Sequence, residues 1–384
     1  MPTITAVPIS ADLVHGALDL EHAAHGLLPQ RLTARARAVA DPQLAGAAAQ
    51  GSGVRLALRT AATLVELDVF RTTLQFRGLV PRPDCPFDLL VDGKPAGQAL
   101  PGGGTTMVID PATYAVDVRQ GTISTVRFDG LPAHEKTVEI WLPHYEQIEL
   151  VELRADAPVA PAPTRGPVWL HYGSSISQGS NAVNPTGIWP VIAAAQAGVE
   201  LVNMGFSGSA MLDQPVARAM REQPADLISV KIGINLINDV MRMRAFTPAV
   251  HGFLDTIRDG HPQTPLLVIS SILCPMLEDV PGPASFDLSA GDGVLRFAAT
   301  GDPADVPAGK LTLQTTRAEL ARIVAQRAAD DPNLHLLDGR ELYGEADSAE
   351  RPLPDRLHPD AVTQRLMGER FAALAFGTGG AFAR

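Results

Sequence analysis

The chain has 384 residues, of which 46% are hydrophobic and 19% are charged, and its formal net charge is −11. This length predicts two domains, and the composition is that of a globular protein rather than a disordered or fibrous one. The negative charge opposes binding to phosphate backbones and no basic run offsets it, so nucleic acid is not an expected partner.

The two cysteines, Cys85 and Cys274, belong to no CxxC motif or Cys/His cluster, which argues against a disulfide framework and a structural zinc site. The histidines show no supported ligand spacing, so no metal is expected. The N-terminus lacks a basic segment followed by an apolar core, and no apolar run reaches about 18 residues. We therefore expect a cytoplasmic protein without a membrane partner.

Residues 1–160 carry the patterns of short strands. The Ala-rich stretch 31–50 leaves a helical turn and an ordered loop both open. Apolar and polar residues alternate from Val54, which is typical of half-buried antiparallel strands. Strands are expected within 17–29 and at 54–60, 64–71, 87–91, 105–109, 122–128, 137–142 and 147–153. With hairpin signals at Asp92-Gly93 and Asp129-Gly130, the pattern predicts an all-β jelly-roll sandwich domain.

An Ala- and Pro-rich stretch from Ala155 has the composition of an extended linker, and a second domain is expected over residues 166–384. Strands at 168–172, 199–204, 226–232, 265–271 and 334–338 alternate with helices near 187–197, 213–222, 247–259, 312–329 and 361–375. This order predicts an α/β domain with a five-stranded parallel sheet covered on both faces. The irregular stretch 275–309 is a long connection, which is unusual unless it is functional.

Residues 168–179 are the stretch from which the chemistry is inferred. A short apolar strand runs into a turn at Gly173, which places Ser175 at the carboxyl edge of the sheet, where ligands of open α/β sheets bind. A serine hydroxyl is a weak nucleophile without a base and a group that orients the base. Asp355 and His358, three residues apart between the last strand and the closing helix, supply both.

Two further turns follow the neighbouring strands. One contains Gly208 in Asn-Met-Gly-Phe-Ser-Gly-Ser, and the other contains Asn235 in Lys-Ile-Gly-Ile-Asn. Either turn by itself is explained by the need for glycine at a positive φ. Together with Ser175 they indicate backbone N–H groups and one Asn amide around the oxyanion of an acyl-transfer transition state.

These stretches resemble the blocks of the GDSL, or SGNH, family of serine acyl-hydrolases. In the first block Gly173, Ser175, Ile176, Ser177 and Gly179 fit the family, whereas Ser174 replaces its Asp. Leu236 replaces the Asp that follows the family's Asn, and Asn238-Asp239 leaves open a shifted register with Asn238 in place of Asn235. The resemblance covers about residues 166–376.

The resemblance implies an SGNH-type, flavodoxin-like three-layer domain. It also implies Ser175 as nucleophile, His358 as general base and acid, Asp355 as the group that orients it, and Ser175, Gly208 and Asn235 as the oxyanion hole. Apolar residues near these loops either line an aromatic acyl pocket or belong to the core: Trp189, Phe206, Met211 and Met241.

The two-domain layout resembles GDSL acyltransferases of tetracycline biosynthesis and carbohydrate esterases with a β module. It implies that an aryl, salicylyl-like acyl group is taken from a thioester donor and held on the serine as an acyl-enzyme. The acyl group is then transferred to a hydroxyl of a polyketide- or tetracycline-like small molecule. The alternative is an esterase that hydrolyses a small-molecule or carbohydrate ester. No cofactor is expected, and acyl-CoA is a candidate co-substrate. A binding module with a dead site would lack one of Ser175, Asp355 and His358, and all three are present.

Overall fold

The computed structural model describes residues 4–111, 113, 115–239 and 241–383, so the outermost residues of both predicted domains lie outside it. The chain forms two compact units. The β unit contains residues 1–34, 45–165 and 183–186, and the α/β unit contains residues 35–44, 166–182 and 187–384. The division into domains at 1–160 and 166–384 stays a proposal. Among the described residues, no helix is both long and apolar enough to cross a membrane.

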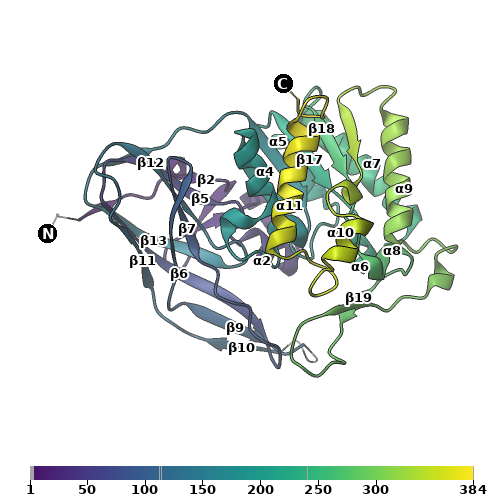
Figure 1. Ribbon diagram of the computed structural model, residues 1–384, viewed down its shortest axis with the longest axis horizontal. Helices are drawn as coiled ribbons and strands as arrows, with labels where there is room; N and C mark the ends of the chain where they lie inside the picture. The colour runs from purple at the N-terminus through teal and green to yellow at the C-terminus, as the bar shows by residue number, and fades with distance from the viewer. Residues whose placement is uncertain (1–3, 112, 114, 240, 384) are drawn as a thin grey trace. The chain divides into compact units, whose positions relative to one another are not determined.

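The β unit contains two sheets (Figure 1). The first has the order β10 (Val116–Arg119), β9 (Thr105–Ile109), β6 (Leu64–Phe76), β13 (Gln147–Ala155), β4 (Leu27–Gln30) and β3 (Asp19–His22), with β1 (Thr5–Val7) beside β13 and β11 (Ser124–Asp129) beside β6. The second has the order β14 (Val159–Pro161), β5 (Arg55–Thr60), β12 (Lys136–Trp141), β7 (Phe87–Val91) and β8 (Lys94–Ala99), with β2 (Val14–His15) beside β5.

Apolar side chains from both sheets meet in one core. Alternate residues of β6, such as Val65 and Leu67, join Phe87 of β7 and Ile140 of β12 there, all of them fully buried. The alternation of apolar and polar residues along the sequence therefore indicates which side of each strand faces this core. The predicted N-terminal β-rich domain is confirmed, and its jelly-roll class stays a prediction.

Local predictions in the β unit have mixed outcomes. Asp92 and Gly93, both at positive φ, join the antiparallel strands β7 and β8, so this hairpin is confirmed. The hairpin at Asp129-Gly130 is wrong, because β11 pairs with β6 of the first sheet and β12 pairs with β5 and β7 of the second. The expected linker is partly a strand, since β14 pairs with β5. Short helices before β5 are η1 (Ala11–Leu13), α1 (Ala34–Arg37) and α2 (Pro42–Ala48), and most of α1 and the start of α2 belong to the α/β unit.

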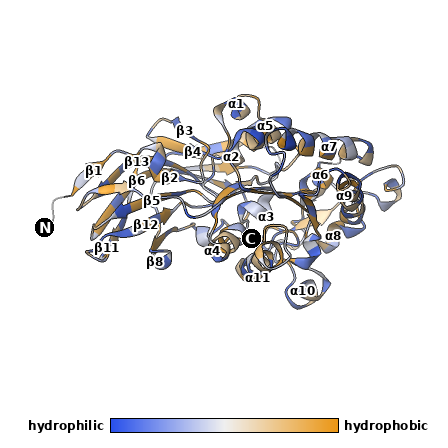
Figure 2. Cartoon of the chain, turned by 90° about the horizontal axis from the view of Figure 1, so that it is seen from above, coloured by the Kyte–Doolittle hydropathy of each residue, from blue (hydrophilic) through white to orange (hydrophobic). Residues whose placement is uncertain are grey.

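The α/β unit has a five-stranded parallel sheet, as predicted. Its order is β16 (Glu200–Gly205), β15 (Val168–Gly173), β17 (Leu227–Lys231), β18 (Leu266–Ile269) and β21 (Leu334–Leu337). Every residue of β17 and β18 is buried because helices cover both faces of the sheet, which explains why both sequences are mostly apolar. Helices α4 (Trp189–Ala197) and α11 (Ala361–Phe371) lie on one face, and α5 (Gln214–Glu222) and α7 (Met243–Gly260) lie on the other (Figure 2).

The remaining helices of the unit are short, apart from α9. They are α3 (Ser175–Gln178), η2 (Pro185–Gly187, of which only Gly187 belongs to this unit), α6 (Ile234–Asn238), α8 (Pro275–Glu278), η3 (Pro303–Asp305), α9 (Leu313–Arg327), η4 (Gly339–Glu341), α10 (Glu345–Glu350) and the π-helix η5 (Ala372–Phe376). The helix α9 begins where predicted because Thr312 and Thr315 form a reciprocal capping box. The helix α7 begins four residues before its predicted start and contains Pro248.

Candidate active site

Ser175 is the first residue of the short helix α3, directly after strand β15 and the capping residue Ser174. Gly173 ends the strand, and a Cβ at this position would overlap the Ser177 side chain. Gly179 ends the helix with a φ of 106°, a conformation that side chains disfavour. The strand, the two glycines and the cap together hold Ser175 at the carboxyl edge of the sheet.

A buried histidine supports this turn from below. His171 Nδ1 lies 2.7 Å from Ser229 Oγ, and its Nε2 lies 2.8 Å from Ser177 Oγ. Burial, with a smaller contribution from the charge of Lys231, lowers the pKa of His171 to about 3. The ring is therefore neutral near pH 7 and serves as a hydrogen-bonding spacer between β15, β17 and α3. Sequence analysis assigned no role to His171.

Three of the predicted site residues lie in hydrogen-bond contact. Ser175 Oγ lies 2.9 Å from His358 Nε2, and His358 Nδ1 lies 2.7 Å from Asp355 Oδ2. All three side chains are buried. A carboxylate accepts hydrogen bonds only, so an ionised Asp355 assigns the proton of a neutral imidazole to Nδ1 and leaves Nε2 to accept from the serine hydroxyl.

Asp355 is held in its ionised form. Burial raises the pKa of its carboxyl, but hydrogen bonds and charge attraction from His358, with the backbone N–H groups of Leu357 and His358, lower it to a net value of about 2. These N–H groups donate to Asp355 Oδ1 over 2.9 and 2.6 Å. The carboxylate is thus available to orient the imidazole over the whole neutral range.

Asn181 is a site residue that the sequence reasoning missed. Its Nδ2 donates to Asp355 Oδ2 over 3.1 Å and approaches the His358 carbonyl oxygen at 3.5 Å. Its φ of 65° is uncommon for a residue other than glycine. Asn181 therefore ties the loop after α3 to the loop of Asp355 and His358. Only its nearness to Ser175 in the sequence pointed to it.

The turns that carry Gly208 and Asn235 meet the Ser175 turn at one edge of the sheet. Strand β15 lies between β16 and β17, and all three are parallel. The Ser207 N–H donates to Gln178 Oε1 of α3 over 2.8 Å, and the Ala210 N–H donates to Asn235 Oδ1 over 3.1 Å. Hydrogen bonds thus connect the three turns in a row.

This arrangement leaves polar hydrogens available for a ligand. Among the described residues, no hydrogen-bond acceptor faces the backbone N–H of Ser175, the N–H of Gly208 or the Nδ2 amide of Asn235. Gly208 adopts a φ of 70°, and Asn235 is only 5% exposed. Asn238, the alternative to Asn235, stands at the end of α6 with a buried side-chain oxygen that has no partner in the described part of the chain.

Part of the 275–309 stretch lies on the Asp355–His358 loop. It forms a two-stranded hairpin of β19 (Ala284–Phe286) and β20 (Phe297–Ala299), which the sequence did not predict. The Phe297 N–H donates to the Asp355 carbonyl oxygen over 3.0 Å, and the Phe297 ring meets the His358 ring edge to face at 5.5 Å. Of the four apolar residues near the site loops, Trp189 and Phe206 are fully buried, as the core alternative predicts.

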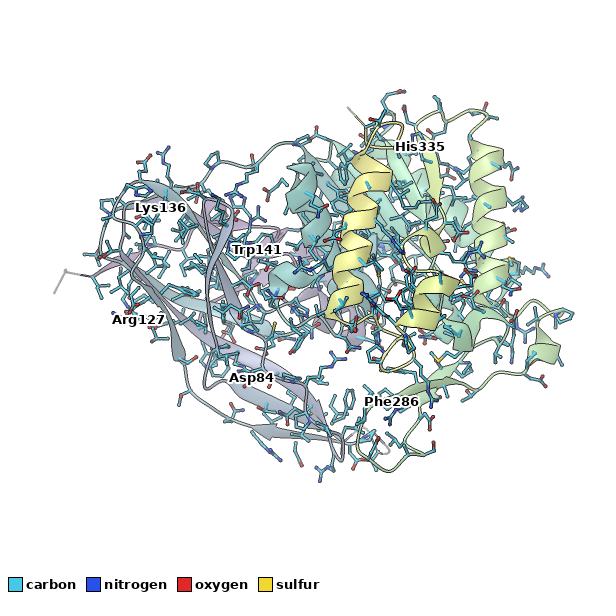
Figure 3. All side chains as sticks on the ribbon, viewed as in Figure 1. Asp84, Arg127, Lys136, Trp141, Phe286 and His335 are labelled. Atoms are coloured by element: carbon cyan, nitrogen blue, oxygen red, sulfur yellow. The ribbon has the colours of Figure 1, made fainter. Side chains whose placement is uncertain are left out.

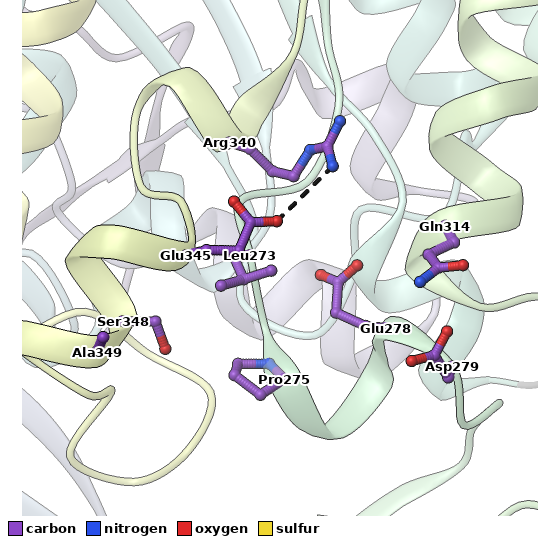
Figure 4. A pocket seen from close by; sticks show the side chains of 9 residues that line it. All are labelled: Leu273, Pro275, Glu278, Asp279, Gln314, Arg340, Glu345, Ser348 and Ala349. Atoms are coloured by element: carbon purple, nitrogen blue, oxygen red, sulfur yellow. Dashed lines mark ion pairs between the residues drawn. The ribbon is translucent and has the colours of Figure 1, made fainter.

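A cavity of about 580 Å³ lies elsewhere in the α/β unit (Figure 4). Its lining mixes apolar side chains with side chains of both signs of charge: Leu273, Pro275, Glu278, Asp279, Gln314, Arg340, Glu345, Ser348 and Ala349. Glu278 is already held by two hydrogen bonds from Arg317, at 2.9 and 3.0 Å, and Arg340 lies 3.8 Å from Glu345. Neither Ser175 nor His358 lines this cavity, so it is distinct from the candidate active site.

Comparison with known proteins gives two family matches. The model of the GDSL-like lipase/acylhydrolase family matches residues 167–275, and that of the SsfX3 N-terminal domain matches residues 13–151. No curated protein matches the chain.

Solved structures with a similar fold include the salicylyl-acyltransferase SsfX3 from a tetracycline biosynthetic pathway. The TM-score is 0.76 and the identity 27%, over 96% of this chain and 95% of that one. A structure described as a GDSL-like lipase from Bacteroides ovatus gives 0.69 and 19%, over 96% of both chains. A family two carbohydrate esterase from Clostridium thermocellum gives 0.53 and 14%, over 84% of this chain and 91% of that one. The last two show likeness of fold only.

These matches agree with the arrangement of a serine, a histidine and an aspartate at the carboxyl edge of a parallel sheet. Residues 167–275 therefore resemble a GDSL-like lipase/acylhydrolase and residues 13–151 resemble the N-terminal domain of SsfX3, and these matches support an enzyme that transfers or hydrolyses acyl groups.

Proposed function

We propose that the protein is an acyltransferase in which Ser175, His358 and Asp355 form a catalytic triad. The observation that carries the proposal is the chain of hydrogen bonds from Ser175 Oγ to His358 Nε2, 2.9 Å, and from His358 Nδ1 to Asp355 Oδ2, 2.7 Å. Transfer is favoured over hydrolysis as the main reaction because the chain resembles a salicylyl-acyltransferase over nearly its whole length.

In the first half-reaction Ser175 attacks the acyl carbon of the donor. His358 Nε2 takes the hydroxyl proton as the Oγ–C bond forms, and then gives it to the departing sulfur as the C–S bond of a thioester breaks. The free N–H groups of Ser175 and Gly208 and the Asn235 amide stabilise the negative charge on the former carbonyl oxygen. The product is a Ser175-bound acyl ester and a free thiol, which would be CoA if the donor is acyl-CoA.

In the second half-reaction an acceptor hydroxyl attacks the acyl-enzyme. His358 takes the acceptor's proton, the new C–O bond forms, and the proton returns to Ser175 Oγ as its bond to the acyl carbon breaks. Water in place of the alcohol makes the same site an esterase. The proposed natural reaction moves an aryl, salicylyl-like acyl group to a hydroxyl of a polyketide- or tetracycline-like small molecule.

Release of the leaving group from an activated aryl ester tests the acyl-enzyme. The wild type should release about one equivalent in a rapid burst, because acylation precedes the slower deacylation. Ser175→Ala and His358→Ala should each lose nearly all activity, since triad members act as a unit. Ser174→Ala is the comparison in the same turn: it removes the capping hydroxyl of α3 but keeps the proposed nucleophile, so a burst should remain. A burst that survives Ser175→Ala and vanishes in Ser174→Ala would show that the wrong serine was chosen.

The balance between transfer and hydrolysis is measured on the same acyl-enzyme. An alcohol is titrated into the reaction, and the acylated alcohol and the free acid are quantified by chromatography with mass detection. Transfer should dominate at acceptor concentrations far below that of water. Free acid as the only product, with every alcohol tried, would make the protein an esterase.

A further inference from the structure

The 284–299 hairpin is fastened to the loop that carries the proposed base. Its strands pair in the register Phe286 to Phe297, and the Phe297 N–H donates to the Asp355 carbonyl oxygen over 3.0 Å. At the tip side, Asp287 Oδ2 lies 2.8 Å from Arg356 Nη1. The hairpin and the Asp355–His358 loop are thus joined at two points.

Three rings run in a row from the hairpin to the site. Phe286 and Phe297 meet with centroids 5.5 Å apart and planes at 66°, and Phe297 and His358 meet at 5.5 Å and 75°. Both are the edge-to-face geometry that aromatic rings favour. Phe297 therefore contacts the imidazole directly, and Phe286 extends the aromatic surface away from it.

The outer part of this row is exposed. Phe286 is 38% exposed, and its hairpin neighbours Leu288 and Val294 are 46% and 41% exposed. Figure 3 shows the Phe286 side chain on the hairpin. Ion pairs flank these apolar residues, Asp287 with Arg356 and Asp292 with Arg296. An exposed apolar surface with a charged rim is typical of a binding site.

The position of this surface determines what it would bind. An acceptor must give its proton to His358 Nε2, so its hydroxyl has to lie beside the imidazole that Phe297 contacts. Phenyl rings offer water no hydrogen bond, whereas they offer a flat apolar acceptor contact area. The surface thus favours an aromatic alcohol over water at the deacylation step.

We propose that Phe286 and Phe297 form the wall of the acceptor subsite, and that the acceptor is an aromatic or fused-ring alcohol. The proposal rests on the acyltransferase function above. In the step concerned, the acceptor O–H proton moves to His358, the acceptor oxygen bonds to the acyl carbon, and Ser175 leaves and recovers the proton.

The test uses competition between two alcohols for one acyl-enzyme. The full-length enzyme is acylated with an activated aryl ester in the presence of 2-naphthol and methanol, and the ratio of naphthyl to methyl ester is measured. This ratio does not depend on the amount of active enzyme or on the acylation rate. In Phe286→Ala it should fall about 2-fold to 10-fold, the worth of one aromatic contact. Phe297→Leu, which keeps apolar bulk beside the imidazole, should lower it as well.

Leu374→Ala is the matched control, because Leu374 is also 38% exposed and lies on η5, outside the hairpin. Its ratio should equal that of the wild type. An unchanged ratio in Phe286→Ala, or an equal fall in Leu374→Ala, would overturn the acceptor wall while leaving the acyltransferase intact. Absence of a burst in the wild type would instead refute the proposed function itself.

Discussion

Replacing Asn235 by aspartate should remove one oxyanion donor while preserving the local fold. Asn235 Oδ1 accepts the Ala210 N–H over 3.1 Å, and the residue is 5% exposed. A carboxylate has the same shape and still accepts that hydrogen bond, but it puts an oxygen where the Nδ2 donor was. Loss of one oxyanion donor typically lowers kcat about 10²-fold to 10³-fold, or roughly 3–4 kcal/mol of transition-state stabilisation. The negative charge beside the oxyanion should make the loss at least as large.

Asn235→Ala provides the comparison. It removes the same donor, so acylation should slow by a similar factor, but it also leaves the Ala210 N–H unpaired. A buried N–H without a partner costs about 1–3 kcal/mol of stability. The alanine variant should therefore have a lower melting temperature than the aspartate variant, although both are poor catalysts.

Stopped-flow release of the leaving group from an activated aryl ester gives the acylation rate constant, and circular dichroism gives the melting temperature. In the shifted register Asn238 takes the place of Asn235 as the oxyanion donor, and Asn238→Ala would then be the variant that loses activity. An acylation rate for Asn235→Asp within threefold of the wild type, together with a large loss in Asn238→Ala, would refute the assignment.

Three further outcomes are expected. Folding lowers the pKa of Asp355 from 3.8 to about 2, so at about 1.4 kcal/mol per pKa unit its ionisation stabilises the folded state by about 2 kcal/mol. This stabilisation is present above pH 4 and is lost as the pH falls toward 2. The difference in melting temperature between wild type and Asp355→Asn should therefore shrink over that range. Gly208→Ala should lose about 1–2 kcal/mol of stability in thermal unfolding, because the φ of Gly208 is 70° and the new Cβ would overlap Gln43 Nε2. If adding Gln43→Ala restored all of the lost stability, backbone strain would not be the cause. Asn181→Ala should slow acylation several-fold, because Asp355 loses a hydrogen bond that fixes the carboxylate beside His358. An acylation rate equal to that of the wild type would show that this hydrogen bond does not position Asp355.

The three residues that meet in hydrogen-bond contact, Ser175, His358 and Asp355, could be singled out from the sequence because each stands at the end of a regular element. Ser175 follows a buried apolar strand, and Asp355 and His358 precede a helix that begins after an N-capping aspartate, Asp360. Parallel strands bring their carboxyl ends to one edge, so the order of the elements implies that these loops meet. The strands of the α/β unit accordingly lie within a few residues of their predicted bounds.

The rest depends on contacts that no local pattern encodes. Asn181 reaches Asp355 through a positive φ, and the general preference of asparagine for this conformation is too weak to single out one position in the sequence. The 284–299 hairpin has strands of three residues, too short for a period of two to be visible. The prediction of a hairpin at Asp129-Gly130 was wrong because turn residues do not indicate whether the next strand pairs within the same sheet. His171 and Phe297 acquire their roles only from the side chains around them.

The most direct test of the account is to locate the acyl group. The wild-type enzyme is quenched in acid during the burst with an aryl ester, digested, and its peptides are sequenced by mass spectrometry. The account predicts one acyl group per chain, which fragment ions assign to Ser175 rather than to Ser174 or Ser177 of the same peptide, and which is absent from Ser175→Ala and from the peptide of Cys274. An acyl group on any other residue, or turnover without an acyl group on Ser175, would contradict it.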